Sequence, residues 1–94
     1  MRGPLPAPVR CAVAHDSAIF AARSMMRPFA SQLGFEREVV EELVLVVSEL
    51  TSNILKYGRR GYIELSGIDR EEGPRGISIV AEDEPPPFDL AGSL

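Results

Sequence analysis

The clearest pattern in the sequence is the spacing of apolar residues between Glu36 and Gly58. Eight apolar side chains recur there at intervals of three and four, as on one face of an α-helix; they are Val39, Val40, Leu43, Val46, Val47, Leu50, Ile54 and Tyr57. This spacing predicts a helix over residues 36–58 with one broad buried face. Gly58 and Gly61 mark its end, since glycine suits the residue after a helix.

A second apolar pattern predicts a shorter helix before the long one. Asp16 or Ser17 is a suitable first cap, because either side chain can accept hydrogen bonds from the free amides of a helix start. Residues at helical spacing follow up to Leu33, and Gly34 is a fitting stop. Pro28 lies inside this stretch, and a proline there removes one backbone hydrogen bond and clashes with the preceding turn. We therefore expect a kink or a break at Pro28.

Alternation of apolar residues predicts three strands. Val9, Cys11 and Val13 alternate in a short strand that we expect at a sheet edge. Residues 62–68 and 77–81 alternate in the same way, and the polar segment between them contains Gly73-Pro74. These two strands are therefore expected to form a hairpin with a loose loop.

The order strand, helix, helix, strand, strand predicts an α+β two-layer sandwich, with both helices on one face of an antiparallel or mixed sheet. Residues 1–8 contain prolines and a glycine and are expected to form a flexible N-terminal tail. The acidic residues 82–84 are expected to form a solvated turn rather than a cation site.

Charge and composition narrow the function. The net charge is −4, and the ten Lys and Arg residues are scattered except for Arg59-Arg60, so no basic stripe is available for nucleic acid. The longest apolar run, Leu43–Val47, is far shorter than the roughly 20 residues of a membrane helix. We therefore expect a cytoplasmic protein. Cys11 is the only cysteine, and its place in an alternating strand indicates a small buried hydrophobe.

Polar residues on the long helix are the candidates for chemistry. Glu49 and Asn53 are four residues apart, so they lie on one side of the helix about one turn from each other. A carboxylate can position an attacking hydroxyl, and a carboxamide oxygen suits a magnesium ion that bridges nucleotide phosphates. Lys56 is placed to reach a phosphate. From spacing alone, however, an ordinary solvated helix face is the better interpretation, since such pairs occur on nearly every surface helix.

The stretch Leu45–Gly58, which contains Ser-Glu-Leu-Thr-Ser-Asn, resembles the N box of the GHKL (histidine-kinase-like) ATPase superfamily. It is most similar to the N box of bacterial serine/threonine switch kinases and anti-sigma factors. Residues 21–35 resemble their first helix, residues 61–63 the strand after the N box, and residues 76–83 the strand that leads to the adenine site. The resemblance covers essentially residues 9–90 and implies a partial Bergerat (GHKL ATPase) fold.

The resemblance also implies roles for individual residues. In that family the N-box glutamate acts as the catalytic base or positions water, the asparagine coordinates magnesium, and an aspartate bonds the adenine amino group. Carried over to this sequence, these residues are Glu49, Asn53 and Asp83, with Lys56 as a phosphate contact. The implied cofactors are ATP and Mg, and the implied activity is that of a serine/threonine protein kinase-like regulator of bacterial stress or sporulation signalling. Its partner would be an antagonist domain or a sigma factor.

Two features depart from the family pattern. Pro85 and Pro87 stand where the family has the two glycines after the adenine aspartate. Proline fixes φ at about −65° and has no amide hydrogen, whereas glycine lets the backbone approach a bound base closely. The chain also ends at Leu94, before the family's lid, second glycine-rich loop, third helix and last two strands. We therefore expect residues 9–94 to form an incomplete GHKL domain.

These departures leave a second function open, a non-catalytic protein-interaction module without nucleotide turnover. An incomplete domain would also leave the strand at residues 77–81 with an unpaired edge. Such an edge predicts a homo-oligomer formed by strand pairing, or completion of the sheet by another chain.

Overall fold

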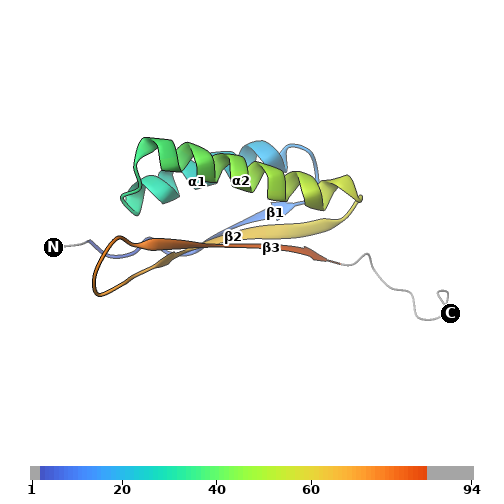
Figure 1. The fold of residues 1–94 in the computed structure, drawn as a ribbon. Helices are drawn as coiled ribbons and strands as arrows, with labels where there is room; N and C mark the ends of the chain where they lie inside the picture. Colours follow the sequence, from blue (N-terminus) through green and yellow to red (C-terminus); the bar gives the residue numbers. More distant parts are fainter. Residues whose placement is uncertain (1–2, 85–94) are drawn as a thin grey trace.

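Two helices cover one face of a three-stranded antiparallel sheet in the computed structural model, which describes residues 3–84 (Figure 1). The elements in chain order are β1 (Val9–Val13), α1 (Ala18–Gln32), α2 (Arg37–Lys56), β2 (Arg60–Ile68) and β3 (Gly76–Glu84). The predicted order of elements and the α+β sandwich are confirmed. In the described part of the chain, neither helix combines the length and the apolar content that a membrane-spanning helix requires.

Strand β2 is the centre of the sheet, with β1 and β3 antiparallel on its two sides. The predicted edge position of β1 is confirmed. Cys11, Ile63 and Ala81 form one row across the sheet, and burial raises the pKa of the Cys11 thiol, which disfavours the reactive thiolate. Within residues 3–84, the outer edge of β3 pairs with no other strand.

The acidic residues 82–84 do not form the expected turn. They continue β3 and pair with β2, with Glu82 opposite Tyr62 and Glu84 opposite Arg60. Backbone pairing does not depend on side-chain type, and the three acidic side chains are exposed, so their charges remain hydrated. The Tyr62 hydroxyl also donates a hydrogen bond of 2.8 Å to Glu82.

Of the kink or break expected at Pro28, the break does not occur, because helix α1 continues through this residue. Pro28 and Ser24, the residue whose carbonyl loses its helical partner, are both exposed, and water can therefore hydrogen-bond that carbonyl. Ser17 occupies the N-cap position, but its side chain makes no capping hydrogen bond. Instead, the backbone amide of Ala18 donates to the carbonyl of His15.

The turn from α1 into α2 is a glycine-dependent helix stop. Gly34 has a φ of 90°, which non-glycine residues rarely adopt. The amide of Gly34 donates to Ser31, and that of Phe35 donates to Ala30, the pair of bonds that defines a Schellman motif. The predicted stop at Gly34 is confirmed, and the motif lets α2 start only a few residues later.

Helix α2 lies within the predicted range of residues 36–58, but its buried face is narrower than the apolar pattern predicts. Val46 is 41% exposed and Tyr57 is 70% exposed. The fully or nearly fully buried residues are Val40, Val44, Val47, Thr51 and Ile54. The Thr51 hydroxyl donates a 2.7 Å hydrogen bond to the Val47 carbonyl, so this buried polar group is satisfied.

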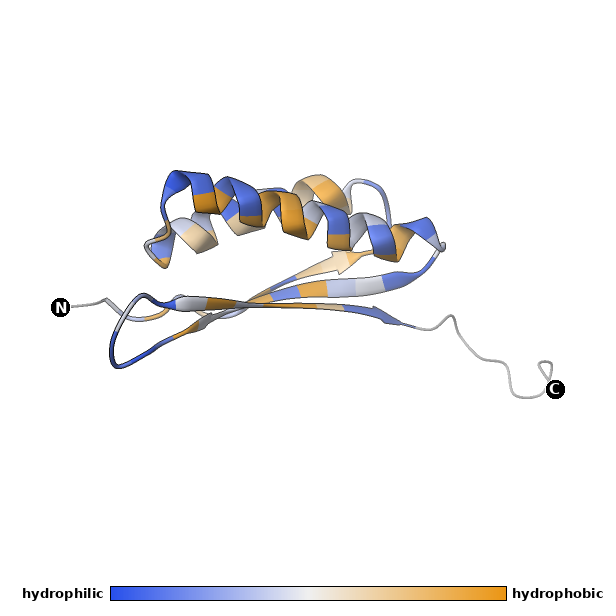
Figure 2. Ribbon diagram, in the orientation of Figure 1, coloured by the Kyte–Doolittle hydropathy of each residue, from blue (hydrophilic) through white to orange (hydrophobic). Residues whose placement is uncertain are grey.

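The core lies between the sheet and the two helices. Its largest fully buried side chains are Val13 from β1, Met26 from α1, Val47 and Thr51 from α2, and Ile63 and Leu65 from β2. Figure 2 shows hydrophobic and hydrophilic residues alternating along the helices and strands, the pattern from which the elements were predicted. Residues 3–8 form no helix or strand, and Leu5 among them packs against the core.

Candidate functional site

The C-terminal half of α2 and the end of β3 form a pocket of about 260 Å³. Its lining residues are Leu50, Asn53, Ile54 and Tyr57 from the helix side, and Ala81 and Asp83 from β3. Ala81 faces the helices, and alternate residues of a strand share a face, so Asp83 faces the same side. The pocket therefore brings together Asn53 and Asp83, two of the four site residues predicted from the sequence.

The other two predicted residues, Glu49 and Lys56, lie on α2 outside the pocket lining, and both are exposed. At about 100° per residue, Glu49 lies roughly 160° around the helix axis from the buried Val47. Its position is thus on the outer side of the helix, one turn before Asn53. The Lys56 ammonium lies 5.6 Å from the centre of the Tyr57 ring, within the range of a cation–π contact.

Asp83 has a charged partner that sequence reasoning missed. The Arg59 guanidinium donates a hydrogen bond from Nη1 to Asp83 Oδ2 at 2.8 Å, and both side chains are nearly half exposed. In the sequence, Arg59 was notable only as one of two adjacent basic residues, Arg59-Arg60. The contact follows from the β2–β3 register, which pairs Arg60 with Glu84, and nothing in the spacing of residues 59 and 83 indicates it.

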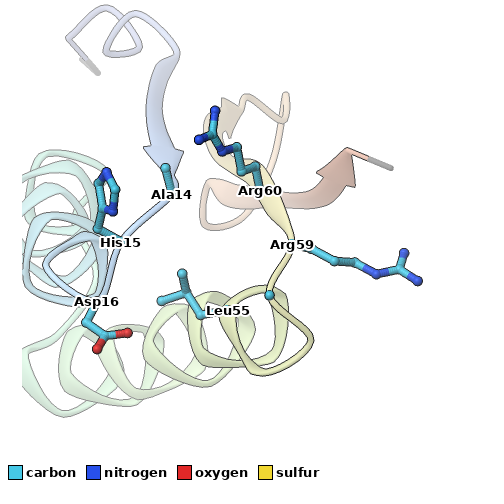
Figure 3. A pocket seen from close by; sticks show the side chains of 7 residues that line it. Ala14, His15, Asp16, Leu55, Arg59 and Arg60 are labelled. Carbon is cyan, nitrogen blue, oxygen red and sulfur yellow. The ribbon is translucent and has the colours of Figure 1, made fainter. Parts of the chain in front are cut away.

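A larger pocket of about 560 Å³ lies between the β1–α1 connection and the α2–β2 turn (Figure 3). Its lining consists of Ala14, His15, Asp16, Leu55, Gly58, Arg59 and Arg60, and includes none of the predicted site residues. The side chains of His15 and Asp16 point in different directions, which argues against a catalytic pair, and the side chain of Arg59 extends away from this pocket (Figure 3).

Comparison with known proteins identifies the family. The family model of the histidine kinase-like ATPase domain matches residues 12–94. The chain belongs to the histidine kinase-like ATPase family. Its resemblance to the GHKL superfamily, inferred from the N box, is therefore confirmed.

Within this family, the chain is similar to the serine/threonine-protein kinase RsbT of Bacillus subtilis (strain 168), with 35% identity over 68 residues. The aligned stretch is 72% of this chain and 50% of the relative, so the chain spans about half the length of the kinase that it matches. This similarity supports the serine/threonine kinase branch over other histidine kinase-like ATPases. No solved structure matches the chain.

Proposed function

We propose that this chain is a regulatory protein of the switch-kinase type, which binds ATP with magnesium at the pocket between α2 and β3 and acts on a protein partner in anti-sigma signalling. The observation that carries the proposal is the convergence of Asn53 and Asp83, from two separate elements, on one pocket. Family membership and the likeness to a serine/threonine-protein kinase support the reaction class.

The chemistry of the lining fits an adenine base. An ionised carboxylate accepts hydrogen bonds and cannot donate them, so Asp83 suits an amino group on the ligand. Leu50, Ile54 and Ala81 supply apolar contacts beside it. Ligand pockets generally measure about 300–1,000 Å³, so this pocket of about 260 Å³ matches a base better than a whole nucleotide.

The magnesium site would depend on few protein ligands. In the part of the chain that the structure describes, no group of three or more His, Cys, Asp or Glu residues is arranged to hold a metal ion. Magnesium bound to a nucleotide is commonly held by one or two side chains together with the phosphates and water. In this site the Asn53 amide oxygen would be the protein ligand.

The remaining predicted residues would act on the outer side of α2. Bound ATP would supply the phosphoryl group for transfer to a serine or threonine of the partner. Glu49, one turn before Asn53, would orient the partner's hydroxyl and accept its proton. Lys56, three residues after Asn53, would contact a phosphate.

A second candidate function is a non-catalytic module that binds a partner of the same pathway without nucleotide turnover. Two observations favour it. Glu49 and Lys56 lie outside the pocket lining, and Pro85 and Pro87, which lie outside the described residues, replace the family's loop glycines. In either case, the outer edge of β3 is the proposed contact with a protein, either a second copy of this chain or another chain that adds strands to the sheet.

Calorimetric titration of the whole chain with ATP and magnesium tests the site. We expect micromolar binding that Asn53→Ala abolishes and that Ser52→Ala leaves intact. Ser52 is a matched control because it is an exposed polar neighbour on α2 that does not line the pocket. Equal binding by the two variants would contradict the proposed site, and no heat at millimolar nucleotide would favour the non-catalytic module.

Light scattering after size-exclusion chromatography tests the proposed edge contact. We expect a dimer or a complex whose formation is blocked when a proline replaces Val80 in β3, because proline cannot donate a backbone hydrogen bond to a neighbouring strand. Circular dichroism must show that this variant keeps its fold. A stable monomer with negligible binding of hydrophobic dye would exclude the second-copy form of the proposal.

A further inference from the structure

We infer that Arg59 is a positioning residue that orients Asp83 for recognition of an amino group on the ligand. This inference rests on the proposed adenine-nucleotide site. It adds to that site a residue, Arg59, that does not line the 260 Å³ pocket itself. Its basis is the 2.8 Å hydrogen bond from Arg59 Nη1 to Asp83 Oδ2.

The backbone around this contact is closely constrained. Gly58 has a φ of 64°, a conformation that suits glycine, and it turns the chain at the end of α2 directly before Arg59. On the other side of the contact, a Cβ added to Gly61 would lie 2.0 Å from the carbonyl oxygen of Glu82, so β2 and β3 approach each other unusually closely at this end. The residues that carry both charges are therefore held next to each other by the main chain.

The side chain of Arg59 is directed to this contact rather than to the neighbouring cavity. Arg59 contributes to the lining of the 560 Å³ pocket. Figure 3 nevertheless shows its side chain extending away from that pocket, unlike that of Leu55. Within residues 3–84, the hydrogen-bonding partner of the guanidinium is Asp83.

The contact leaves the recognition chemistry of Asp83 available. Arg59 binds Oδ2, and within residues 3–84 no hydrogen bond reaches the other carboxylate oxygen, Oδ1. A carboxylate has about four acceptor positions, so a ligand amino group can bind while the guanidinium stays in place. Arg59 thus restricts the rotation of the Asp83 side chain, which is 45% exposed. Because Asp83 is already restricted, it loses less rotational freedom when the ligand binds.

This role predicts a specific change in selectivity. An acceptor-only group distinguishes a 6-aminopurine from a 6-oxopurine, which presents a carbonyl oxygen at the same position. Loss of Arg59 would leave the apolar lining intact but would loosen Asp83, so selectivity for the amino group would fall. If Arg59 instead blocked the carboxylate, its removal would raise adenosine affinity.

The test compares adenosine and inosine, which differ at that position, by equilibrium dialysis against the whole chain. For Arg59→Ala we expect the adenosine-to-inosine affinity ratio to fall by about 1.5- to 5-fold at low salt, the range for an exposed ion pair. Because salt screens exposed charges, the difference should shrink at high salt. Arg59→Lys, which keeps the charge but not the planar fork, should restore part of the ratio.

Arg60→Ala is the matched control. It removes the same charge from the next residue, and Arg60 makes no side-chain hydrogen bond or ion pair with the rest of residues 3–84. The adenosine-to-inosine affinity ratio of Arg60→Ala should equal that of the unaltered chain. An equal fall in both variants, an unchanged ratio in Arg59→Ala, or tighter adenosine binding by Arg59→Ala would each overturn the inference.

The two proposals fail in different ways. If the unaltered chain binds adenosine and Arg59→Ala keeps its full selectivity, the role of Arg59 is wrong and the nucleotide site stands. If the unaltered chain binds no adenosine, the proposed site and the role of Arg59 both fall. The ¹³C resonance of the Asp83 carboxyl, measured without ligand, should shift in Arg59→Ala but not in Arg60→Ala, and the absence of that shift would show that the contact does not form in solution.

Discussion

Replacing Gly61 by alanine tests the close backbone approach that holds the site end of the sheet together. Gly61 lies in β2 opposite Asp83. A Cβ at this position would lie 2.0 Å from the carbonyl oxygen of Glu82 and 2.8 Å from the Cα of Asp83. Both contacts are with backbone atoms, which cannot rotate out of the way as a side chain can. The end of β3 must therefore move away from β2 in this variant.

The expected change in the free energy of unfolding of Gly61→Ala is the difference between two opposing contributions. Alanine in a strand gains about 0.5–1 kcal/mol over glycine, because glycine loses more conformational freedom on folding. Overpacking in a close-packed region costs about 1–3 kcal/mol, and a contact between two main chains belongs at the upper end of that range. We expect a net loss of about 1–2 kcal/mol in the free energy of unfolding. For a domain of this size, such a loss lowers Tm by about 4–16 °C.

Urea denaturation followed by circular dichroism measures this loss, and Gly67→Ala is the matched control in the same strand. A Cβ at Gly67 would meet the Cδ2 atoms of Leu33 at 2.9 Å and of Leu5 at 3.1 Å. Both are ends of flexible side chains, so we expect that variant to stay within about 1 kcal/mol of the unaltered chain. If Gly61→Ala proves as stable as Gly67→Ala, the close β2–β3 approach is wrong.

Two further predictions concern the core and the surface of the helical layer. Ile63→Ala should lower the free energy of unfolding, measured by urea denaturation, by about 2–5 kcal/mol, because the Ile63 side chain is fully buried. Phe20 is 70% exposed, so Phe20→Ala should change it by no more than about 0.5 kcal/mol. Similar losses in the two variants would contradict the burial of Ile63. A hydrogen bond from the Arg27 guanidinium lowers the pKa of Glu41 below 4.5. The stabilising effect of this pair is therefore complete above pH 4.5 and is lost as the pH falls through the lowered pKa. In an NMR titration, Arg27→Ala should return the Glu41 pKa towards 4.5, and an unchanged titration would show that the pair does not form.

The elements of the fold were largely predictable, because each depends on local chemistry. The three- and four-residue spacing located α2, alternation located the three strands, and Gly34 marked the end of α1. The errors arose where the surroundings decide the outcome. Pro28 stays within a continuous helix because its face of α1 is exposed, and the acidic end of β3 stays in the sheet because β2 pairs with it.

The candidate site was predictable only in part. The family resemblance located Asn53 and Asp83, and the fold brings both to one pocket. The exposure of Tyr57 depends on which flank of α2 has a neighbour, and helical periodicity alone carries no information about that neighbour. The roles of Glu49 and Lys56 remain predictions, since both lie outside the pocket lining.

By itself, the sequence determined the family, the order of the elements and the residues available for chemistry, because periodicity, turn residues and the N-box motif are properties of short stretches of chain. Only the tertiary structure decided which of those residues meet. The contact of Arg59 with Asp83, and the closeness of Asp83 to Asn53, depend on strand register and on the packing of α2 over β3. These are long-range relations, in which a shift of one residue in register would turn Asp83 to the opposite face of the sheet.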